Sequence, residues 1–299
     1  MAFRRQRTIA GVAACIAVAL AAAGCGDAEP EAKDDVWVVP NPTFEPGSSM
    51  EKLNEKGKLT IGVKIDQPGV GLKEPGAKQP EGFDIEMAKI IAGKMGIEPE
   101  NIKWVEAIPE NREKYLQNGT VDLVLATYSI TPERRKVVGM AGPYYETGQQ
   151  LLVRKDETRI NGPDDVEGKK VCSVAGTTSI QRVEDEYGAE PVPDKTYTAC
   201  VDQLLDGAVD AVTTDGALLL GYAAEDPDEL KVVGEPFSTE RYGVGYRKGD
   251  TEMCEFLNKA LNRSYRDGTW VDALSKTLWK TTGAVPYPDT DPCPGAQDS

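Results

Sequence analysis

The chain has 299 residues, a formal net charge of -15 and no histidine. Without an imidazole, a Ser-His-Asp or Cys-His catalytic arrangement and a histidine metal ligand are excluded. The acidic balance argues against nucleic-acid binding, which requires a basic footprint, and the 40% apolar content predicts a globular chain with one large or two ordinary domains.

The first residues have the layout of a secretory signal peptide. Arginines at positions 4, 5 and 7 precede an apolar run from Ile9 to Ala23, which is short for a membrane span. Small residues come directly before Cys25 and the chain then turns polar, as in a bacterial lipobox. We therefore expect residues 1–24 to be a signal peptide and Cys25 to be lipidated. Ordinary signal cleavage with a free Cys25 thiol is the alternative.

The segments at the two ends of the folded part are predicted to be irregular. Residues 25–49 are rich in Asp, Glu, Pro, Gly and Ser, which predicts a flexible tether that holds the folded part away from a membrane. Residues 286–299 repeat Pro and Asp and are expected to form an irregular tail.

Between these segments, short apolar runs alternate with amphipathic segments. Strands are predicted at Lys58–Val63, Ile102–Val105, Val121–Ala126, Lys170–Val174, Glu190–Val192, Ala208–Thr213, Lys231–Val233 and Tyr242–Tyr246. Helices are predicted at Asp84–Met95, Glu110–Gln117, from Thr131 and Pro132 onward, and at Thr177–Tyr187, Thr198–Leu205, Gly216–Ala224, Glu252–Arg266 and Thr269–Trp279. This alternation predicts an α/β fold with mostly parallel sheets. The pattern restarts near Gly168, which suggests two similar lobes.

Four cysteines are left after Cys15 and Cys25 are assigned to the signal and the lipid. Pairing each with its nearest neighbour in sequence gives Cys172–Cys200 and Cys254–Cys293, and an exported location favours disulfides over four buried thiols. No CxxC spacing occurs in the sequence, so no cysteine metal site is predicted.

Ligands of open α/β sheets bind beyond the carboxyl ends of the strands, so three loops are candidates: Ala126–Arg134, Val174–Ser179 and Thr213–Gly216. The first offers hydroxyls at Thr127 and Ser129 and the guanidinium of Arg134, which can hold a carboxylate through two hydrogen bonds.

The second candidate loop carries the hydroxyls of Thr177 and Thr178 at a predicted helix start, and the third carries Asp215, whose carboxylate suits an ammonium group. Together the loops suggest an α-amino acid as ligand. Taken singly, each has an ordinary alternative: Arg134 as a surface helix residue, Asp215 as a helix cap and Thr177–Ser179 as a capping cluster.

Motifs along residues 50–279 resemble the polar-amino-acid solute-binding proteins of bacterial ATP-binding-cassette (ABC) importers, a periplasmic-binding-protein-like type II family. Those motifs are Gly82-Phe83-Asp84-Ile85-Glu86, Gly119-Thr120-Val121-Asp122, Ser129-Ile130-Thr131-Pro132-Glu133-Arg134, Gly142-Pro143-Tyr144-Tyr145, Gly176-Thr177-Thr178-Ser179 and Asp206-Gly207-Ala208-Val209-Asp210-Ala211-Val212. Finer detail is similar to glutamate-binding lipoproteins of actinobacteria.

The resemblance implies a two-lobed α/β fold with a ligand cleft between the lobes and two hinge strands, near Gln150–Arg154 and Tyr242–Tyr246. It places the first lobe at residues 50–151 and 247–285 and the second at 152–246. It implies no cofactor and no metal, a monomer, and a membrane permease as partner.

The same resemblance assigns roles to individual residues. Arg134 falls on the position that binds the ligand's α-carboxylate, with help from Ser129 and Thr178, and Asp215 with the Ala126–Thr127 backbone falls on the ammonium-binding position. Thr214 stands where some relatives carry histidine.

In relatives that bind glutamate or aspartate, basic residues occupy positions that hold Lys64 and Arg112 here. Two cations favour an anionic side chain, so glutamate, or aspartate, is the predicted ligand. Solvated surface charge is the alternative interpretation of these two residues.

Other functions stay open at the level of sequence. A binding protein for glutamine or another polar amino acid has the same overall pattern, as does a sensor lipoprotein that signals instead of feeding a permease. An enzyme on this fold, such as a cyclohexadienyl dehydratase, is the remote alternative, because no paired acid and base can be identified. We expect a non-enzymatic protein on the outer face of the cell membrane.

Overall fold

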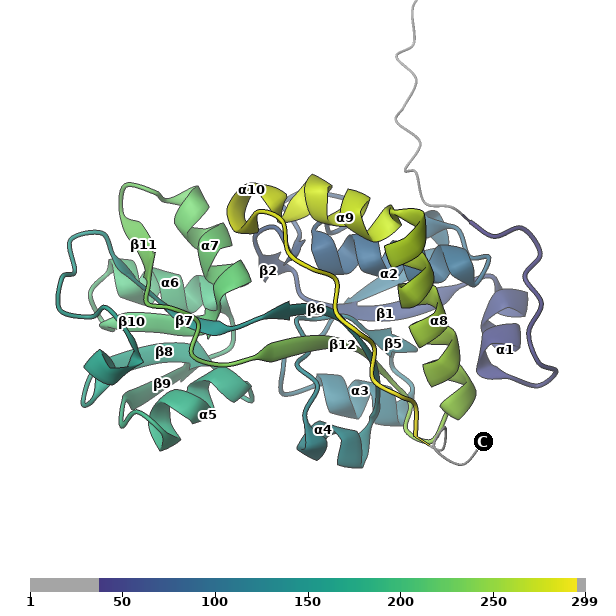
Figure 1. Cartoon of the computed structure of the whole chain (residues 1–299), viewed down its shortest axis with the longest axis horizontal. Helices are drawn as coiled ribbons and strands as arrows, with labels where there is room; N and C mark the ends of the chain where they lie inside the picture. The colour runs from purple at the N-terminus through teal and green to yellow at the C-terminus, as the bar shows by residue number, and fades with distance from the viewer. Residues whose placement is uncertain (1–37, 295–299) are drawn as a thin grey trace, which may run out of the picture. The chain divides into compact units, whose positions relative to one another are not determined.

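The structure is a computed structural model that describes residues 38–294, so the predicted signal peptide and Cys25, the predicted lipidation site, lie outside the described residues. Two five-stranded sheets and the helices that cover them form the two lobes within this range (Figure 1). The two-lobed α/β fold is therefore as predicted. No helix among the residues described is long and apolar enough to cross a membrane.

The first sheet has the order β4-β1-β5-β12-β6. Its strands are β1 (Leu59–Val63), β4 (Ile102–Glu106), β5 (Leu123–Val124), β6 (Gly139–Thr147) and β12 (Glu240–Tyr246). The pairs β1–β4 and β1–β5 are parallel, whereas β12 is antiparallel to both of its neighbours. Helices of this lobe are α1 (Ser49–Lys56), α2 (Phe83–Lys94), α3 (Arg112–Asn118), α4 (Pro132–Val137), α8 (Thr251–Asp267), α9 (Thr269–Thr277) and α10 (Trp279–Thr282).

The second sheet has the order β11-β7-β10-β8-β9. Its strands are β7 (Gln149–Arg154), β8 (Lys170–Val174), β9 (Glu190–Asp194), β10 (Ala211–Asp215) and β11 (Leu230–Val233). Helices α5 (Thr178–Asp185), α6 (Tyr197–Leu205) and α7 (Gly216–Glu225) cover it. A short antiparallel pair, β2 (Asp66–Gln67) with β3 (Gly71–Leu72), extends from the first lobe. Two 3-10 helices, Pro99–Asn101 and Pro163–Val166, complete the described elements.

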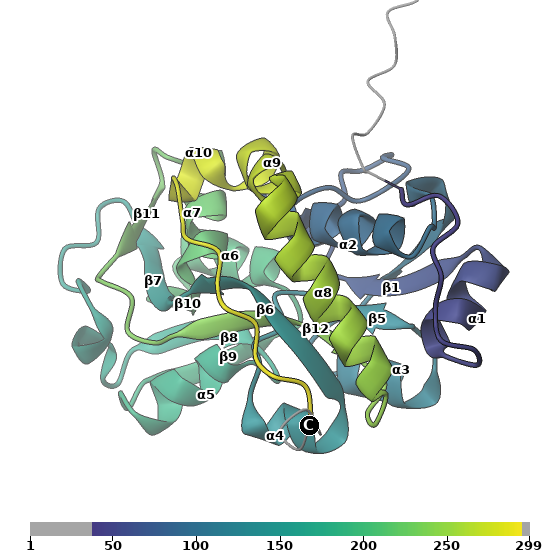
Figure 2. The same cartoon turned by 45° about the vertical axis from the view of Figure 1, so that its right-hand side comes forward.

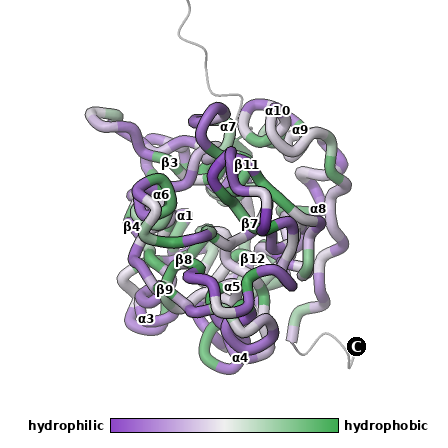
Figure 3. Tube along the Cα trace, turned by 90° about the vertical axis from the view of Figure 1, so that its left-hand side faces the viewer, coloured by the Kyte–Doolittle hydropathy of each residue, from purple (hydrophilic) through white to green (hydrophobic). Residues whose placement is uncertain are grey.

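The sequence pattern explains how each sheet is buried. Strand β10 is buried at all five positions, as expected for a central strand covered on both faces. Figure 3 shows the interior strands of the second lobe as hydrophobic segments and many of the surrounding turns as hydrophilic ones. The carboxyl ends of β5, β8 and β10 consequently hold the polar residues that the sheet interior excludes.

The connections between the lobes differ from the predicted ones. Strand β6 belongs to the first sheet and β7 to the second, so the chain crosses at Gly148 and returns just before Glu240. Residues 149–151 therefore belong to the second sheet and residues 240–246 to the first. The first boundary between the lobes lies at Gly148 instead of 151/152, and the second lies just before Glu240 instead of at 246/247. The two crossings lie side by side, because Gln149 N donates to Ser238 Oγ at 3.0 Å and Phe237 N to the Gln149 carbonyl at 3.0 Å (Figure 2).

The expected tether is wrong for its described part. Val39 N donates to the Gly93 carbonyl at 2.9 Å, and the Phe44 ring packs edge-on against Phe256 with 5.8 Å between centroids. Residues 39–48 are thus fastened to the first lobe, since a half-buried aromatic ring that packs on the core outweighs the polar composition around it. A flexible tether stays a prediction for residues 25–37.

The two predicted disulfides, Cys172–Cys200 and Cys254–Cys293, are confirmed. The first joins β8 to α6 within the second lobe, and the second fastens the C-terminal segment to α8. Residues 286–293, the described part of the predicted irregular tail, contain no helix or strand. This segment nevertheless crosses β6 and β12 (Figures 1 and 2) and is held there by ion pairs from Asp291 to Arg135 and Arg241.

Candidate ligand site

A small cavity, with about 20 Å³ of water-accessible space, lies between the lobes at the carboxyl ends of the strands. Residues that line it are Gln67, Pro109, Arg112, Thr127, Ser129, Arg134, Thr177, Thr178, Ser179, Tyr197, Thr214 and Asp215. All three loops predicted from the strand ends therefore contribute to one site.

Asp84 of the GFD motif fixes the first loop. Its Oδ2 accepts a hydrogen bond from Thr127 N at 2.7 Å, and its Oδ1 accepts one from Tyr144 OH at 2.6 Å. Thr127 has a φ of 44°, an unusual conformation for a β-branched residue. The buried carboxylate thus holds the backbone of a cavity-lining residue in a strained form, as is common at binding sites. Burial raises the pKa of Asp84 to about 6.

Two arginines pack on one aromatic ring beside the cavity. The guanidinium carbons of Arg112 and Arg134 lie 4.0 Å and 5.1 Å from the centre of the Tyr128 ring. Tyr128 OH donates to Glu113 Oε1 at 2.7 Å, and that oxygen lies 3.7 Å and 3.8 Å from the two arginine Nε atoms. Tyr128 itself does not line the cavity; it supports both cations through cation–π contacts.

Arg112 has unused capacity for hydrogen bonding. Its side chain is buried, and the one hydrogen bond that it makes within residues 38–294, from Nη1 to the Ala126 carbonyl, is long at 3.4 Å. Arg112 Nε has no hydrogen-bond partner among residues 38–294. Burial, followed by the charge of Arg134, lowers the pKa of Arg112 to about 10. An anionic ligand group would satisfy the free donor and offset the repulsion between Arg112 and Arg134, which share the single carboxylate of Glu113.

Arg134 connects the two lobes. Its Nη1 donates to the Ser129 carbonyl in the first lobe at 2.6 Å, and its Nη2 to the Gly176 carbonyl in the second at 3.4 Å. The side chain is only 11% exposed and lines the cavity, so it is not a free surface residue.

The second loop is built as a helix start. Gly176 adopts a φ of 77°, which lets the chain turn after β8, and Thr177 Oγ1 then accepts from Ile180 N at 3.3 Å. Capping is therefore one confirmed role of Thr177, although Thr177 and Thr178 both line the cavity.

Asp215 is a buried carboxylate without a structural cap role. It precedes α7, but its side chain makes no capping hydrogen bond to that helix. Its Oδ2 accepts from Tyr242 OH at 2.7 Å. Burial, with a smaller contribution from the Glu240 charge, raises the pKa of Asp215 to about 7. A ligand ammonium group would restore the favourable environment for its ionised form.

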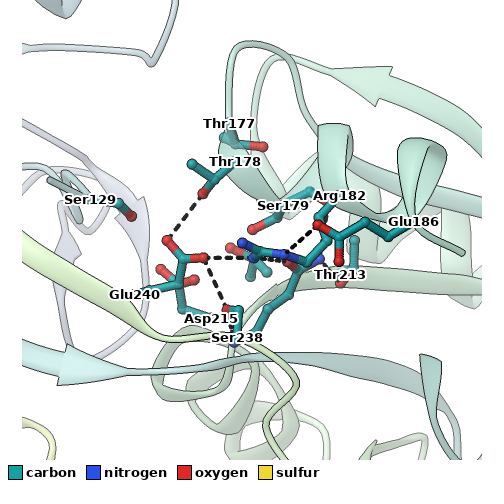
Figure 4. Close-up of polar contacts among 12 residues, drawn as sticks. Ser129, Thr177, Thr178, Ser179, Arg182, Glu186, Thr213, Asp215, Ser238 and Glu240 are labelled. Atoms are coloured by element: carbon teal, nitrogen blue, oxygen red, sulfur yellow. Dashed lines mark hydrogen bonds and ion pairs between the residues drawn. The ribbon is translucent and has the colours of Figure 1, made fainter. Parts of the chain in front are cut away.

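A polar network ties this site to the crossing strands (Figure 4). Glu240 Oε2 accepts from Thr178 Oγ1 at 3.2 Å, and Glu240 Oε1 accepts from Arg182 Nη1 at 3.0 Å. The same Arg182 nitrogen donates to Gln149 Oε1 at 3.1 Å. Residues at both crossings thereby position the turn that lines the cavity.

Lys64 does not line the cavity. It is 1% exposed, and its Nζ lies 2.9 Å from Asp66 Oδ1. The expected ligand cation is therefore paired inside the protein, because Asp66 follows two residues later in the chain. Solvated surface charge, the alternative, is also wrong for Lys64 and for Arg112.

Of the other predicted site residues, Arg112, Thr127, Ser129, Arg134, Thr177, Thr178 and Asp215 line the cavity. Ala126 is buried behind it and supplies its carbonyl to Arg112 and to Thr127 Oγ1. Ser179 and Thr214, which lie in the predicted loops but were given no ligand role, also line the cavity, and Thr214 Oγ1 donates to Tyr197 OH at 2.8 Å. Gln67, Pro109 and Tyr197 line it without having been predicted. Gln67 follows the end of β1 by four residues, so its place after a strand could have identified it, whereas no sequence pattern marks Tyr197.

A two-lobed α/β fold with its cavity between the lobes defines a solute-binding architecture. Residues 59–279 match the family of bacterial extracellular solute-binding proteins, family 3, and the chain belongs to that family. It is accordingly an extracytoplasmic binding protein and not an enzyme.

Similar proteins support this assignment. The glutamate-binding protein GluB of Corynebacterium efficiens is 37% identical over 290 residues, covering 93% of both chains. GluB of Corynebacterium glutamicum is 40% identical over 242 residues, covering 77% of this chain and 82% of the relative. A solved ancestral arginine-binding protein bound to glutamine has a TM-score of 0.69 and 36% identity, covering 76% of this chain and 99% of that one.

Proposed function

We propose that the protein captures glutamate, and with lower affinity aspartate, and delivers it to the permease of an ABC importer. The observation that carries this proposal is the pair of arginines on Tyr128, which line one cavity together with the carboxylate of Asp215. Two cations and one carboxylate complement the two carboxylates and one ammonium group of glutamate. The names of the two corynebacterial relatives point to the same ligand.

Each charged group has a proposed partner in the ligand. Arg134 holds the α-carboxylate with the hydroxyls of Ser129 and Thr178, and Asp215 holds the ammonium group. Arg112, with its unsatisfied Nε, holds the side-chain carboxylate. The global charge of -15 opposes an anionic ligand, so recognition rests on this local cluster, where the surrounding protein excludes much of the screening solvent.

Glutamine is a second candidate ligand, and one observation favours it. Gln67 Oε1 is buried in a cavity-lining residue and has no hydrogen-bond partner in the part of the chain that the structure describes. An acceptor of this kind suits the amide N–H of glutamine better than a carboxylate.

Binding stabilises the folded state by RT ln(1 + [L]/Kd), which is about 2.7 kcal/mol when the ligand is at 100 times Kd. The test is the thermal midpoint of the purified protein with a panel of amino acids. Glutamate is expected to give the largest rise, followed by aspartate. A larger rise with glutamine would move the assignment to that ligand, and an absence of any rise would refute the amino-acid site.

We also propose that residues 1–24 are removed and that Cys25 carries a lipid that anchors the protein to the outer face of the membrane. Mass spectrometry of the mature N-terminus checks this directly. A mature chain that starts elsewhere or carries an unmodified Cys25 would contradict it. Loss of glutamate uptake on gene deletion would favour transport over a sensor role.

A further inference from the structure

The turn that follows β1 in the first lobe reaches helices of the second lobe. Asp66 Oδ2 accepts from Tyr197 N at 3.1 Å, and its main-chain carbonyl accepts from Thr198 Oγ1 at 3.3 Å and from Tyr222 OH. Tyr197 begins α6 and Tyr222 lies on α7. One residue of the first lobe therefore contacts two helices of the second.

A carboxylate at position 66 is favourable because it lies at the N-terminus of helix α6. The first N–H groups of a helix have no partner within the helix and carry partial positive charge. Tyr197 N is such a group, and an oxygen from the opposite lobe satisfies it. Asp66 also compensates the buried charge of Lys64, with Nζ to Oδ1 at 2.9 Å.

A second, independent contact lies beside the first. A Cβ atom added to Gly221 of α7 would lie 2.7 Å from the Pro68 carbonyl oxygen and 3.3 Å from its Cβ. Glycine in the middle of a helix is less favourable than alanine. Here the absence of a side chain is what allows the turn to approach α7.

The turn is firmly held by its own lobe. Phe83 N and Asp84 N, the first amides of α2, donate to the carbonyls of Gly69 and Val70 at 3.0 Å and 2.9 Å. A side chain on Gly82, whose φ is 120°, would collide with the Val70 carbonyl at 2.4 Å. The turn consequently moves with the first lobe as a rigid part, and its contacts with α6 and α7 depend on how far the lobes have closed.

We propose that Asp66 and Pro68, named here the interlobe latch, stabilise the closed arrangement of the lobes and so set the affinity for every ligand without contacting the ligand's side chain. Neither Asp66 nor Pro68 lines the cavity, although the neighbouring Gln67 does. The latch rests on the proposed function only in that a ligand binds between the lobes. In this proposal Lys64 positions the carboxylate of Asp66, whereas the sequence had suggested that Lys64 binds the ligand.

The test is Gly221→Ala, because alanine favours the helix and interferes only where Pro68 approaches. We expect weaker binding of glutamate and glutamine by the same factor, about tenfold, with faster dissociation and no loss of thermal stability without ligand. Gly162→Ala is the matched control, since a Cβ there meets nothing within 4 Å and its φ of -170° suits any residue. That variant should bind as the wild type does.

Small-angle scattering of the ligand-free protein provides a readout that does not depend on the ligand. Gly221→Ala should increase the radius of gyration relative to the control by shifting the population toward open forms. Wild-type affinity, dissociation rate and scattering in Gly221→Ala would overturn the latch. If the wild type binds no amino acid but the scattering difference is present, the proposed function fails and the latch stands.

Asp66→Asn gives a second, more severe variant. It leaves Lys64 buried without its counter-charge and risks a general loss of stability. The double variant Lys64→Met with Asp66→Asn removes both charges and avoids that risk. We expect an equal loss of affinity for glutamate and glutamine in the double variant. A loss confined to glutamate would show that Lys64 reads the ligand and would overturn the latch.

Discussion

The buried carboxyl of Asp215 predicts that ligand affinity depends on pH. Its pKa is raised to about 7, mainly by burial and then by Glu240, while Arg134, Arg182 and the Tyr242 hydroxyl favour the ionised form. An ammonium group binds the carboxylate and not the neutral acid. As pH falls through 7 the free protein becomes protonated at this position, so binding weakens on the acidic side.

The magnitude follows from the fraction of protein that is competent to bind. The apparent Kd is the intrinsic Kd divided by that fraction, which gives a factor of about 11 at pH 6 and about 1.1 at pH 8 for a pKa of 7. We expect glutamate to bind about tenfold more weakly at pH 6 than at pH 8. The chain contains no histidine that would titrate in this range.

Isothermal titration calorimetry at several pH values measures this effect. At pH 7 about half a proton should be released per ligand bound, which is seen as a dependence of the measured enthalpy on the ionisation enthalpy of the buffer. The control is Asp215→Asn, which should bind more weakly and with little pH dependence. Any pH dependence of the affinity that is left in that variant is attributed to Asp84, whose pKa is raised to about 6. A wild-type Kd that changes less than twofold between pH 6 and pH 8 would refute the reasoning.

Three further substitutions test other parts of the structure. Arg134→Ala should abolish most binding of all amino acids, because its guanidinium contacts both lobes and is the proposed partner of the ligand's α-carboxylate. A Kd close to that of the wild type, measured by calorimetry, would contradict this. Arg112→Ala should cost glutamate about 10- to 100-fold, as expected for a charge-assisted hydrogen bond, and glutamine much less; an unchanged ratio of the two Kd values would exclude Arg112 from side-chain recognition. Replacing Cys172 and Cys200 by serine should lower the free energy of unfolding by about 3–4 kcal/mol for a 28-residue separation, measured in urea; an unchanged unfolding midpoint would show that the disulfide adds no stability.

The three binding loops were predictable because a single rule locates them. Parallel strands present their carboxyl ends at one edge of a sheet, so Ser129, Thr177 and Asp215 had to lie at comparable places in the two lobes. Hydroxyls, an arginine and a carboxylate at those ends then define the chemistry. The disulfides were predictable for a similarly local reason, since each pair is adjacent in the order of the cysteines.

The role of Lys64 could not be predicted from the sequence. The sequence places a cation at a strand end, but it does not show that Asp66 lies close enough to pair with it. That pairing depends on the turn after β1 and on contacts with helices about 130 residues further along the chain. Long-range packing of this kind has no local signature.

The boundary between the lobes was misplaced for a related reason. Strands β6 and β7 are almost continuous in sequence, and the glycine between them, Gly148, resembles many others. The two strands are distinguished only because β6 forms hydrogen bonds within the first sheet and β7 within the second. Phe44 was likewise missed, because one aromatic residue in a polar segment gives no periodic pattern, yet its contact with Phe256 fastens that segment to the first lobe.

The most direct test of the central claim is a calorimetric titration of the purified protein with glutamate, glutamine and arginine under one set of conditions at pH 8. A cluster of Arg112 and Arg134 opposite Asp215 predicts the tightest binding for glutamate and no measurable binding for arginine, whose cationic side chain would face a buried cation. Binding confined to arginine would contradict the proposed arrangement of charges in the site.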